Sequence, residues 1–139
     1  YAVFRKDKQY KGIDAWLHNL RNKNKRIMTY EESMKSLITN ITLLMQGREK
    51  TVVYMTGAKI AALDENIKTG ITAGLKESGI TVETGDNVTY DNDSLIKADE
   101  IGLVMIAEQI GGSQLEDIAR ELSAFREHEI DVVGGVVYE

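Results

Sequence analysis

The spacing of apolar residues switches repeatedly between helical and strand-like periods, and this pattern predicts an α/β domain. Four runs rich in apolar and β-branched residues have the length and composition of strands, and amphipathic segments precede or separate them. The predicted strands are 51–56, 80–84, 101–106 and 131–137. The predicted helices are 30–46, 64–78, a short turn at 94–97, and a last helix that follows Ser113 and includes Phe125. Because helices and strands alternate, we expect a small parallel sheet of about four strands with helices on both of its faces.

Short capping motifs predict where two of these helices begin. Thr29 is followed three residues later by Glu32, which is the spacing of a capping box, and Ser113 and Glu116 repeat that spacing. The helix after Thr29 is expected to end before Gly47. Its expected inner face consists of Met34, Leu37, Ile38, Ile41, Leu44 and Met45. The expected inner face of the last helix consists of Leu115, Ile118, Ala119, Leu122 and Phe125.

Charge divides the chain into a basic arm and an acidic body. Residues 1–26 carry eight basic and two acidic side chains, a net +6, and the others carry nine basic and 20 acidic side chains, a net −11. We therefore expect a basic arm over 1–28, with a short helix at 13–22, and a compact α/β domain over 29–139. Such an arm favours contact with an anionic surface: a membrane, a nucleic acid or the acidic body of another copy. The acidic body would repel phosphates, which argues against nucleic-acid binding by the domain.

The opening residues have the order that often follows a membrane span. Aromatic and apolar residues begin at Tyr1, and basic residues follow, as they do at the cytoplasmic end of a transmembrane helix. The basic residues expected to face an anionic membrane surface are Arg5, Lys6, Lys8 and Lys11. The alternative is an ordinary chain terminus. No apolar run in the sequence reaches the 18 or so residues of a membrane helix, so an anchor would have to precede Tyr1.

The composition excludes several kinds of site. The chain has no cysteine and only two histidines, which removes disulfides, thiol nucleophiles, thiolate metal sites and histidine-rich metal sites. Four aspartates follow the second predicted strand: Asp86, Asp91, Asp93 and Asp99. Their spacing does not match a calcium-binding loop, so a solvated turn is favoured over a cation site. We expect neither a metal nor a cofactor.

Two features near the end of the chain have an ordinary structural reading. Gly111 and Gly112 could accept an anion at a helix N-terminus, but a tight turn into Ser113 is favoured. Tyr138 is expected to be an edge aromatic rather than a modification site.

The first strand-to-helix loop, at 57–63, is where a phosphate-binding loop would lie. Such a loop needs several glycines whose N–H groups surround the phosphate, then a Lys, and a Ser or Thr for magnesium. Here Gly57 is the one glycine, Lys59 is the one cation, and the next helix opens with Asp64 and Glu65. Two carboxylates at a helix start would take the place of the anion and repel a triphosphate. A plain connecting loop is therefore favoured.

The order of these segments resembles a known family. Three stretches are the basis of the resemblance. The first is Glu32 to Ile41, before the strand at 51–56. The second is the loop Thr56–Ala58 with its helix to Gly79, and the third is Lys97–Asp99 before the strand and helix that end near Val137. Together they resemble the cytoplasmic tyrosine-kinase domain of bacterial capsule and exopolysaccharide assembly systems, which belongs to the P-loop ATPases. The resemblance implies a P-loop- or Rossmann-like fold.

Departures from the family pattern imply a non-catalytic relative. The phosphate-loop Lys and Ser/Thr fall at Asp64 and Glu65, and the acidic magnesium-binding strand is missing. The family's assembly helix corresponds to Glu32, Lys35, Ile38 and Asn40, which the resemblance makes a candidate interaction surface. The resemblance implies a domain that binds a kinase-like protein partner or itself. It also implies that this domain lies on the cytoplasmic face of the bacterial plasma membrane, as part of a membrane-anchored chain-length-determinant-like protein.

Two other functions remain open at the level of sequence. One is a divergent nucleotide-binding ATPase or tyrosine kinase that uses Lys59, Asp86 and Asp99. The other is an unrelated α/β module that binds a small ligand.

Overall fold

A computed structural model describes residues 2–4 and 29–138. The strands are β1 (Ala2–Phe4), β2 (Val52–Thr56), β3 (Thr81–Thr84), β4 (Leu103–Gln109) and β5 (Asp131–Tyr138). The helices are α2 (Tyr30–Met45), the short 3₁₀ helix η1 (Ile60–Ala62), α3 (Glu65–Glu77), α4 (Asn92–Ile101) and α5 (Leu115–Glu127). The predicted arm helix at 13–22 and the predicted membrane-facing residues Arg5, Lys6, Lys8 and Lys11 lie outside the described residues.

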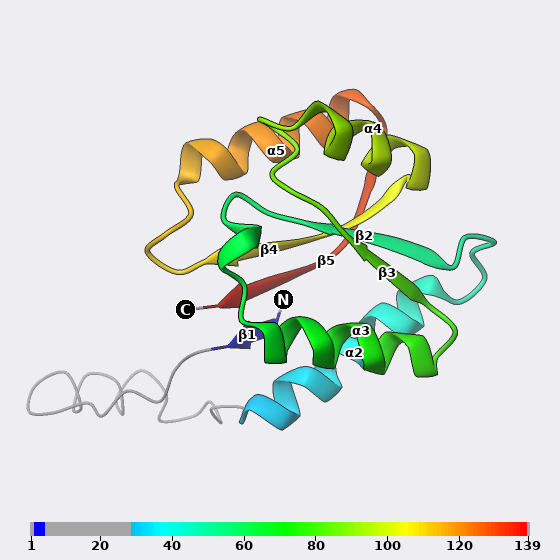
Figure 1. Ribbon diagram of the computed structural model, residues 1–139. Coiled ribbons are helices and arrows are strands. Elements are labelled where there is room, and N and C mark those ends of the chain that lie inside the picture. Colours follow the sequence, from blue (N-terminus) through cyan, green and yellow to red (C-terminus); the bar gives the residue numbers. More distant parts are fainter. Residues whose placement is uncertain (1, 5–28, 139) are drawn as a thin grey trace, which may run out of the picture.

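All strands are parallel, in the order β1-β5-β4-β2-β3 (Figure 1). The sequence-based prediction of a parallel α/β sheet is therefore confirmed. From β2 the chain moves outward to β3, then returns across the sheet to β4 and continues to β5. The direction of winding thus reverses between β2 and β4. In open parallel sheets, ligands bind in the crevice outside the carboxyl ends of the two strands at such a reversal.

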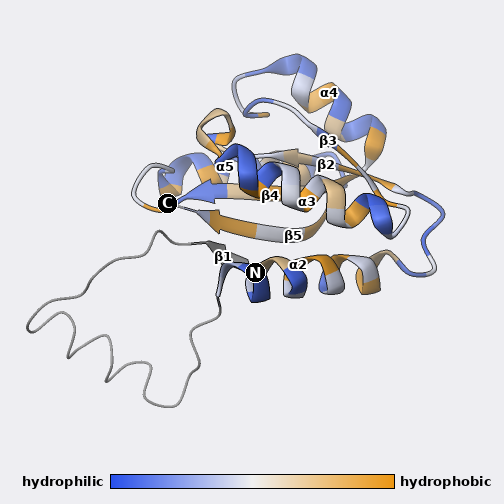
Figure 2. Ribbon diagram, turned by 60° about the horizontal axis from the view of Figure 1, so that its bottom comes forward, coloured by the Kyte–Doolittle hydropathy of each residue, from blue (hydrophilic) through white to orange (hydrophobic). Residues whose placement is uncertain are grey.

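Helices cover both faces of the sheet, as predicted (Figure 1). The connection through α3 runs in the opposite direction to those through α4 and α5, so crossovers of one hand place α3 on one face and the other two on the opposite face. Helix α2 lies beside α3. Blue and orange segments alternate along α2 and α3, as expected for helices with one face against the sheet (Figure 2).

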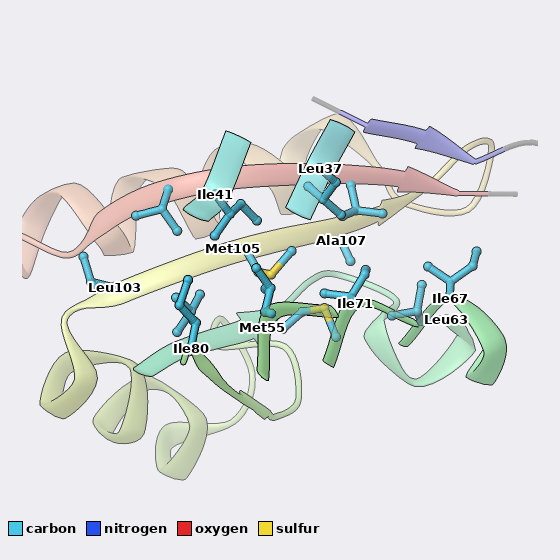
Figure 3. Packing of buried hydrophobic residues seen from close by; sticks show 14 of the residues in the cluster. Leu37, Ile41, Met55, Leu63, Ile67, Ile71, Ile80, Leu103, Met105 and Ala107 are labelled. Atoms are coloured by element: carbon cyan, nitrogen blue, oxygen red, sulfur yellow. The ribbon is translucent and has the colours of Figure 1, made fainter. Parts of the chain in front are cut away.

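The larger core lies between the sheet and the α2–α3 layer. Met55 and Met105 of the central strands are fully buried there, against Ile41 of α2 and Ile71 of α3 (Figure 3). A smaller cluster fills the opposite face under α4 and α5, and includes Phe125. Because both faces of β2 and β4 are covered, these strands are apolar at nearly every position, which is why their sequences read as continuous runs.

Several predicted boundaries are confirmed. The Thr29 hydroxyl accepts a hydrogen bond from the Glu32 N–H at 3.2 Å, and the Glu32 carboxylate accepts one from the Thr29 N–H at 3.4 Å, which completes the capping box. Helix α2 ends just before Gly47, whose φ of 79° lies in the left-handed region that glycine tolerates.

Other predictions are corrected by the structure. Ser113 does not cap the last helix: its hydroxyl accepts from the Gln109 N–H at 2.8 Å, inside a turn, and α5 begins at Leu115. The turn expected at 94–97 is a helix of 10 residues, α4. Because this helix continues to Ile101 and ends at Gly102 in the left-handed region, the next strand starts at Leu103 and extends to Gln109.

The structure also contains a strand that the sequence analysis did not predict. Residues 2–4, assigned to the basic arm, form β1 and pair with 136–138 of β5. As a result β1 is the edge strand and β5 is interior, so Tyr138 is not an edge aromatic. Among the described residues, no helix has the combination of length and apolar character needed to cross a bilayer.

Helix α5 is rotated relative to the orientation that its apolar pattern predicts. Its buried residues are Glu121 and Phe125, while Leu115, Ala119 and Leu122 are exposed. In α2, similarly, Leu44 was expected on the inner face and is exposed beside Leu43. Both departures include leucines that the periodicity assigns to the core.

Candidate functional site

The crevice between the ends of β2 and β4 is the candidate functional site. Gly57, directly after β2, lies against the backbone of Ala107 in β4, and a Cβ on Gly57 would be 1.9 Å from the Ala107 carbonyl oxygen. Since that neighbour is backbone and cannot swing away, only glycine fits at this position. The loop and the strand are therefore in direct contact at the point where a nucleotide-binding protein of this topology would hold phosphate.

A carboxylate of the protein itself occupies the crevice. Glu108, at the carboxyl end of β4, accepts a hydrogen bond from the Ala58 N–H, with Oε2 at 3.2 Å and Oε1 at 3.4 Å. Glu108 is only 7% exposed. In a phosphate-binding loop, backbone N–H groups at this position would point at the anion. Here the side chain of Glu108 satisfies the N–H group and places a negative charge where phosphate would lie.

Carboxylates of the protein also lie at the N-terminus of α3. Asp64 caps the helix, and its Oδ1 accepts from the Asn66 N–H at 2.8 Å. Glu65 is the first residue of the helix, so two carboxylates lie at the positive end of the helix dipole. Lys59 is exposed in the loop, before η1. The four predicted loop residues thus lie along one edge of the sheet. Asp64 accepts an N–H of the helix end that would otherwise be available to an anion, and Glu65 adds a second negative charge there.

A second acid lies on the α5 side of the crevice. Glu121 is 0% exposed, and among the described residues no group donates a hydrogen bond to either of its carboxyl oxygens. Burial, together with a hydrogen bond to Glu108 and the negative charges of Glu108 and Asp117, raises the pKa of Glu121 to about 9. Glu121 is therefore protonated at neutral pH.

Tyr138 reaches the crevice from the opposite face of the sheet. It is fully buried, and its hydroxyl donates to the Lys59 carbonyl oxygen at 2.5 Å. Burial, followed by the charge of Glu108, raises the pKa of Tyr138 to about 12. The hydroxyl thus remains a donor at physiological pH, and it fixes the loop after β2 to the end of β5.

The loop after β3 is fastened to the same edge. The Thr56 hydroxyl donates to the Asp86 carbonyl oxygen at 2.6 Å, and the Asn87 side chain donates to the Ala58 carbonyl oxygen at 3.5 Å. Asp86 and Lys59 therefore share this edge. Asp99 lies in the last turns of α4, which lead to the amino end of β4, so the topology places it toward the opposite edge. The three residues proposed for a divergent ATPase are not brought together.

The remaining sequence candidates are dispersed or have local roles. Asp91 accepts a hydrogen bond from the Ser94 hydroxyl at 2.5 Å. In the part of the chain that the structure describes, no group of three or more acidic or histidine side chains could hold a metal ion. Gly111 and Gly112 form the expected tight turn, in which the Gly112 N–H donates to the Gln109 carbonyl oxygen at 3.2 Å.

The four candidate interaction residues of α2 do not form one exposed surface. Lys35 and Asn40 are exposed, but Glu32 takes part in the capping box. Ile38 is half-buried and packs toward α3, where a Cβ on Gly74 would lie 2.1 Å from its Cδ1. Ile38 therefore contributes to the helix packing.

Sequence reasoning missed Glu108 and Glu121. The predicted strand ended at residue 106, three residues before the observed end at Gln109, so Glu108 was assigned to a loop. Glu121 lies between the apolar positions of α5, and the helical pattern assigns it to the solvent side. The only sequence signal for Glu108 is its position: it is a single acid directly after the apolar run of β4, in a strand that continues to Gln109.

Comparisons with known proteins give no family for the chain. A scan against models of protein families found no match. A search of the curated proteins likewise found no match.

Proposed function

We propose that this is a non-catalytic interaction domain that takes part in capsular or exopolysaccharide assembly and chain-length control. In this proposal it acts at the cytoplasmic face of the bacterial plasma membrane, and its partner is a kinase-like protein or a second copy of the chain. The link to polysaccharide assembly depends on the order of segments in the sequence. The non-catalytic character depends on the chemistry of the crevice.

The single observation that carries the proposal is the Glu108–Ala58 contact. A nucleotide at the carboxyl ends of β2 and β4 would need the loop N–H groups as phosphate donors. The Glu108 carboxylate accepts the Ala58 N–H and is itself buried, so a triphosphate would have to displace it and then meet Asp64 and Glu65 at the start of α3. Coulomb repulsion at such short range is large in a poorly solvated site.

Isothermal titration with Mg²⁺ and ATP tests this proposal. We expect no heat of binding with the natural chain at millimolar ATP. The same result is expected for Lys59→Ala. Saturable ATP binding that is lost in Lys59→Ala would instead support a divergent ATPase and contradict the proposal.

A pull-down tests the partner. The chain would be immobilised and exposed to the capsule-type tyrosine kinase of the same organism, at physiological salt. Retention of the kinase supports the proposed setting. If neither the kinase nor a second copy of the chain is retained, the domain is not an interaction module of this kind.

A further inference from the structure

The outer face of α5 carries an apolar seam. Leu115 is 84% exposed and Leu122 is 38% exposed, and the small residue Ala119 is exposed between them. Arg126 continues the same line. The successive spacings are four, three and four residues, which is the interval at which one face of a helix meets a second helix in a coiled coil. Over 13 residues, α5 presents this line for about 20 Å.

The seam is exposed because α5 faces the sheet with other residues. Glu121 and Phe125 are buried under the helix, and Glu121 is held as a neutral acid beside Glu108. Since Leu115 and Leu122 lie on a different side of the helix from Glu121, the same orientation cannot bury all three. Contiguous apolar patches on a protein surface are typical of sites that bind another protein.

We propose that this seam is where a second copy of the chain docks, through a symmetric antiparallel pairing of the two α5 helices. This inference rests on the proposed function and names the partner that it leaves open. A symmetric pair requires a surface that is complementary to itself, and the seam meets this condition in both shape and charge.

Shape complementarity comes from the alternation of large and small side chains. In the antiparallel register that pairs residues 119 and 122, Leu122 of each copy packs on Ala119 of the other. The small Ala119 allows the helices to approach closely, and the arrangement repeats on both sides of the twofold axis.

Charge complementarity comes from the two ends of the helix. In the same register, Arg126 of one copy lies over Leu115 of the other, with its guanidinium next to Glu116. The symmetric partner pair forms at the other end. The helix therefore carries an acid near its start and a base near its end, Glu116 and Arg126, at the positions that the antiparallel pairing brings together.

The pairing is expected to be weak. One helix pair of this length buries less than the roughly 1,200 Å² typical of stable complexes, so the association belongs to the transient class. It would become significant where several copies are held close together, since effective concentration then replaces affinity.

Sedimentation equilibrium between about 10 µM and 1 mM tests the proposal. The natural chain should show a reversible monomer–dimer equilibrium. Leu115→Glu should weaken the dimer at least tenfold, whereas Leu43→Glu, the same change at a leucine of α2 that is 57% exposed on the other helical layer, should leave it within about twofold. A natural chain that stays monomeric at 1 mM, or equal effects of the two variants, would overturn the proposal.

Charge exchange tests the register. Glu116→Arg and Arg126→Glu should each weaken the dimer several-fold, and the double variant should recover most of the loss. Melting temperatures of all three measure any cost to the helix itself, because both changes oppose the helix dipole. If the double variant associates as weakly as the single variants, this register is wrong.

Cross-linking gives a readout that does not depend on affinity. The chain has no cysteine, so single-cysteine variants are free of background. A mixture of Ala119→Cys and Leu122→Cys should form the mixed disulfide dimer faster than a mixture of Glu116→Cys and Leu122→Cys. Equal rates would contradict the pairing. Failure of these tests together with absent ATP binding leaves the interaction domain with a different partner, whereas ATP binding would contradict the proposed function irrespective of the dimer.

Discussion

At the scale of single residues, the crevice contains two buried acids with different hydrogen-bond partners. Glu108 accepts a hydrogen bond from the Ala58 backbone N–H. Glu121 has no such partner among the described residues and is protonated at neutral pH. Protonation of Glu121 removes one negative charge from this buried site and so lowers the cost of burying the two acids.

Glu121 should make the protein less stable as pH rises. Its pKa is about 9 in the folded protein and about 4.5 in the unfolded chain, so between these values the folded state holds one more proton. The free energy of unfolding therefore falls with rising pH across this range, by up to about 1.4 kcal/mol per pH unit from this group. We expect Glu121→Gln to flatten the decline between pH 6 and 9 in urea denaturation.

Glu127→Gln on the same helix is the control, because Glu127 is exposed and its change should leave the slope as it is. A Glu121→Gln variant with the natural slope would show that Glu121 is ionised in the folded protein.

At the scale of elements, the sequence predicts the helices and strands better than their orientation. Helix caps and the glycines that end helices act locally. Thr29, Gly47 and Gly79 therefore determine their helix ends independently of how the helices pack. The orientation of α5 follows from its packing against the sheet, with Glu121 and Phe125 inward, and no local pattern contains that information. The apolar periodicity therefore predicted this helix correctly but assigned its leucines to the side that faces the sheet, and they lie on the outer side.

The capping box of α2 should contribute measurably to stability. Thr29→Ala removes the hydroxyl that accepts the Glu32 N–H, and we expect a loss of about 1 kcal/mol. Thr39→Ala, an exposed position inside the same helix, should be neutral or slightly stabilising because Ala has the higher helix propensity. Thermal denaturation of both variants measures the difference, and an equal shift in both would mean that the cap contributes nothing.

At the scale of the whole molecule, alternation of elements was sufficient to predict a parallel sheet with two helical layers. It did not predict β1, because three residues at the start of a basic segment carry too little pattern to mark a strand. The crevice could be located from the sequence as a strand-to-helix loop. Its content could not, because Glu108, Glu121 and Tyr138 meet there from three different elements.

Removal of residues 1–4 should expose the edge of β5. The strand pairs with 136–138, so the truncated chain loses those ladder hydrogen bonds. We expect faster amide hydrogen exchange in 136–138 and little change in 53–55 of β2, which lies between β4 and β3. Mass spectrometry of proteolytic fragments measures both regions. Unchanged exchange in 136–138 would mean that β1 does not protect this edge.

The Glu108 contact also determines how easily this fold could acquire a ligand. A single change, Glu108→Ala, would free the Ala58 N–H and remove the buried charge without altering the Gly57–Ala107 contact that shapes the loop. It would also leave Glu121 without the carboxylate that helps to keep it protonated. For protein engineers, this crevice is therefore a natural starting point for an oxyanion receptor, with Asp64 as the next side chain to replace.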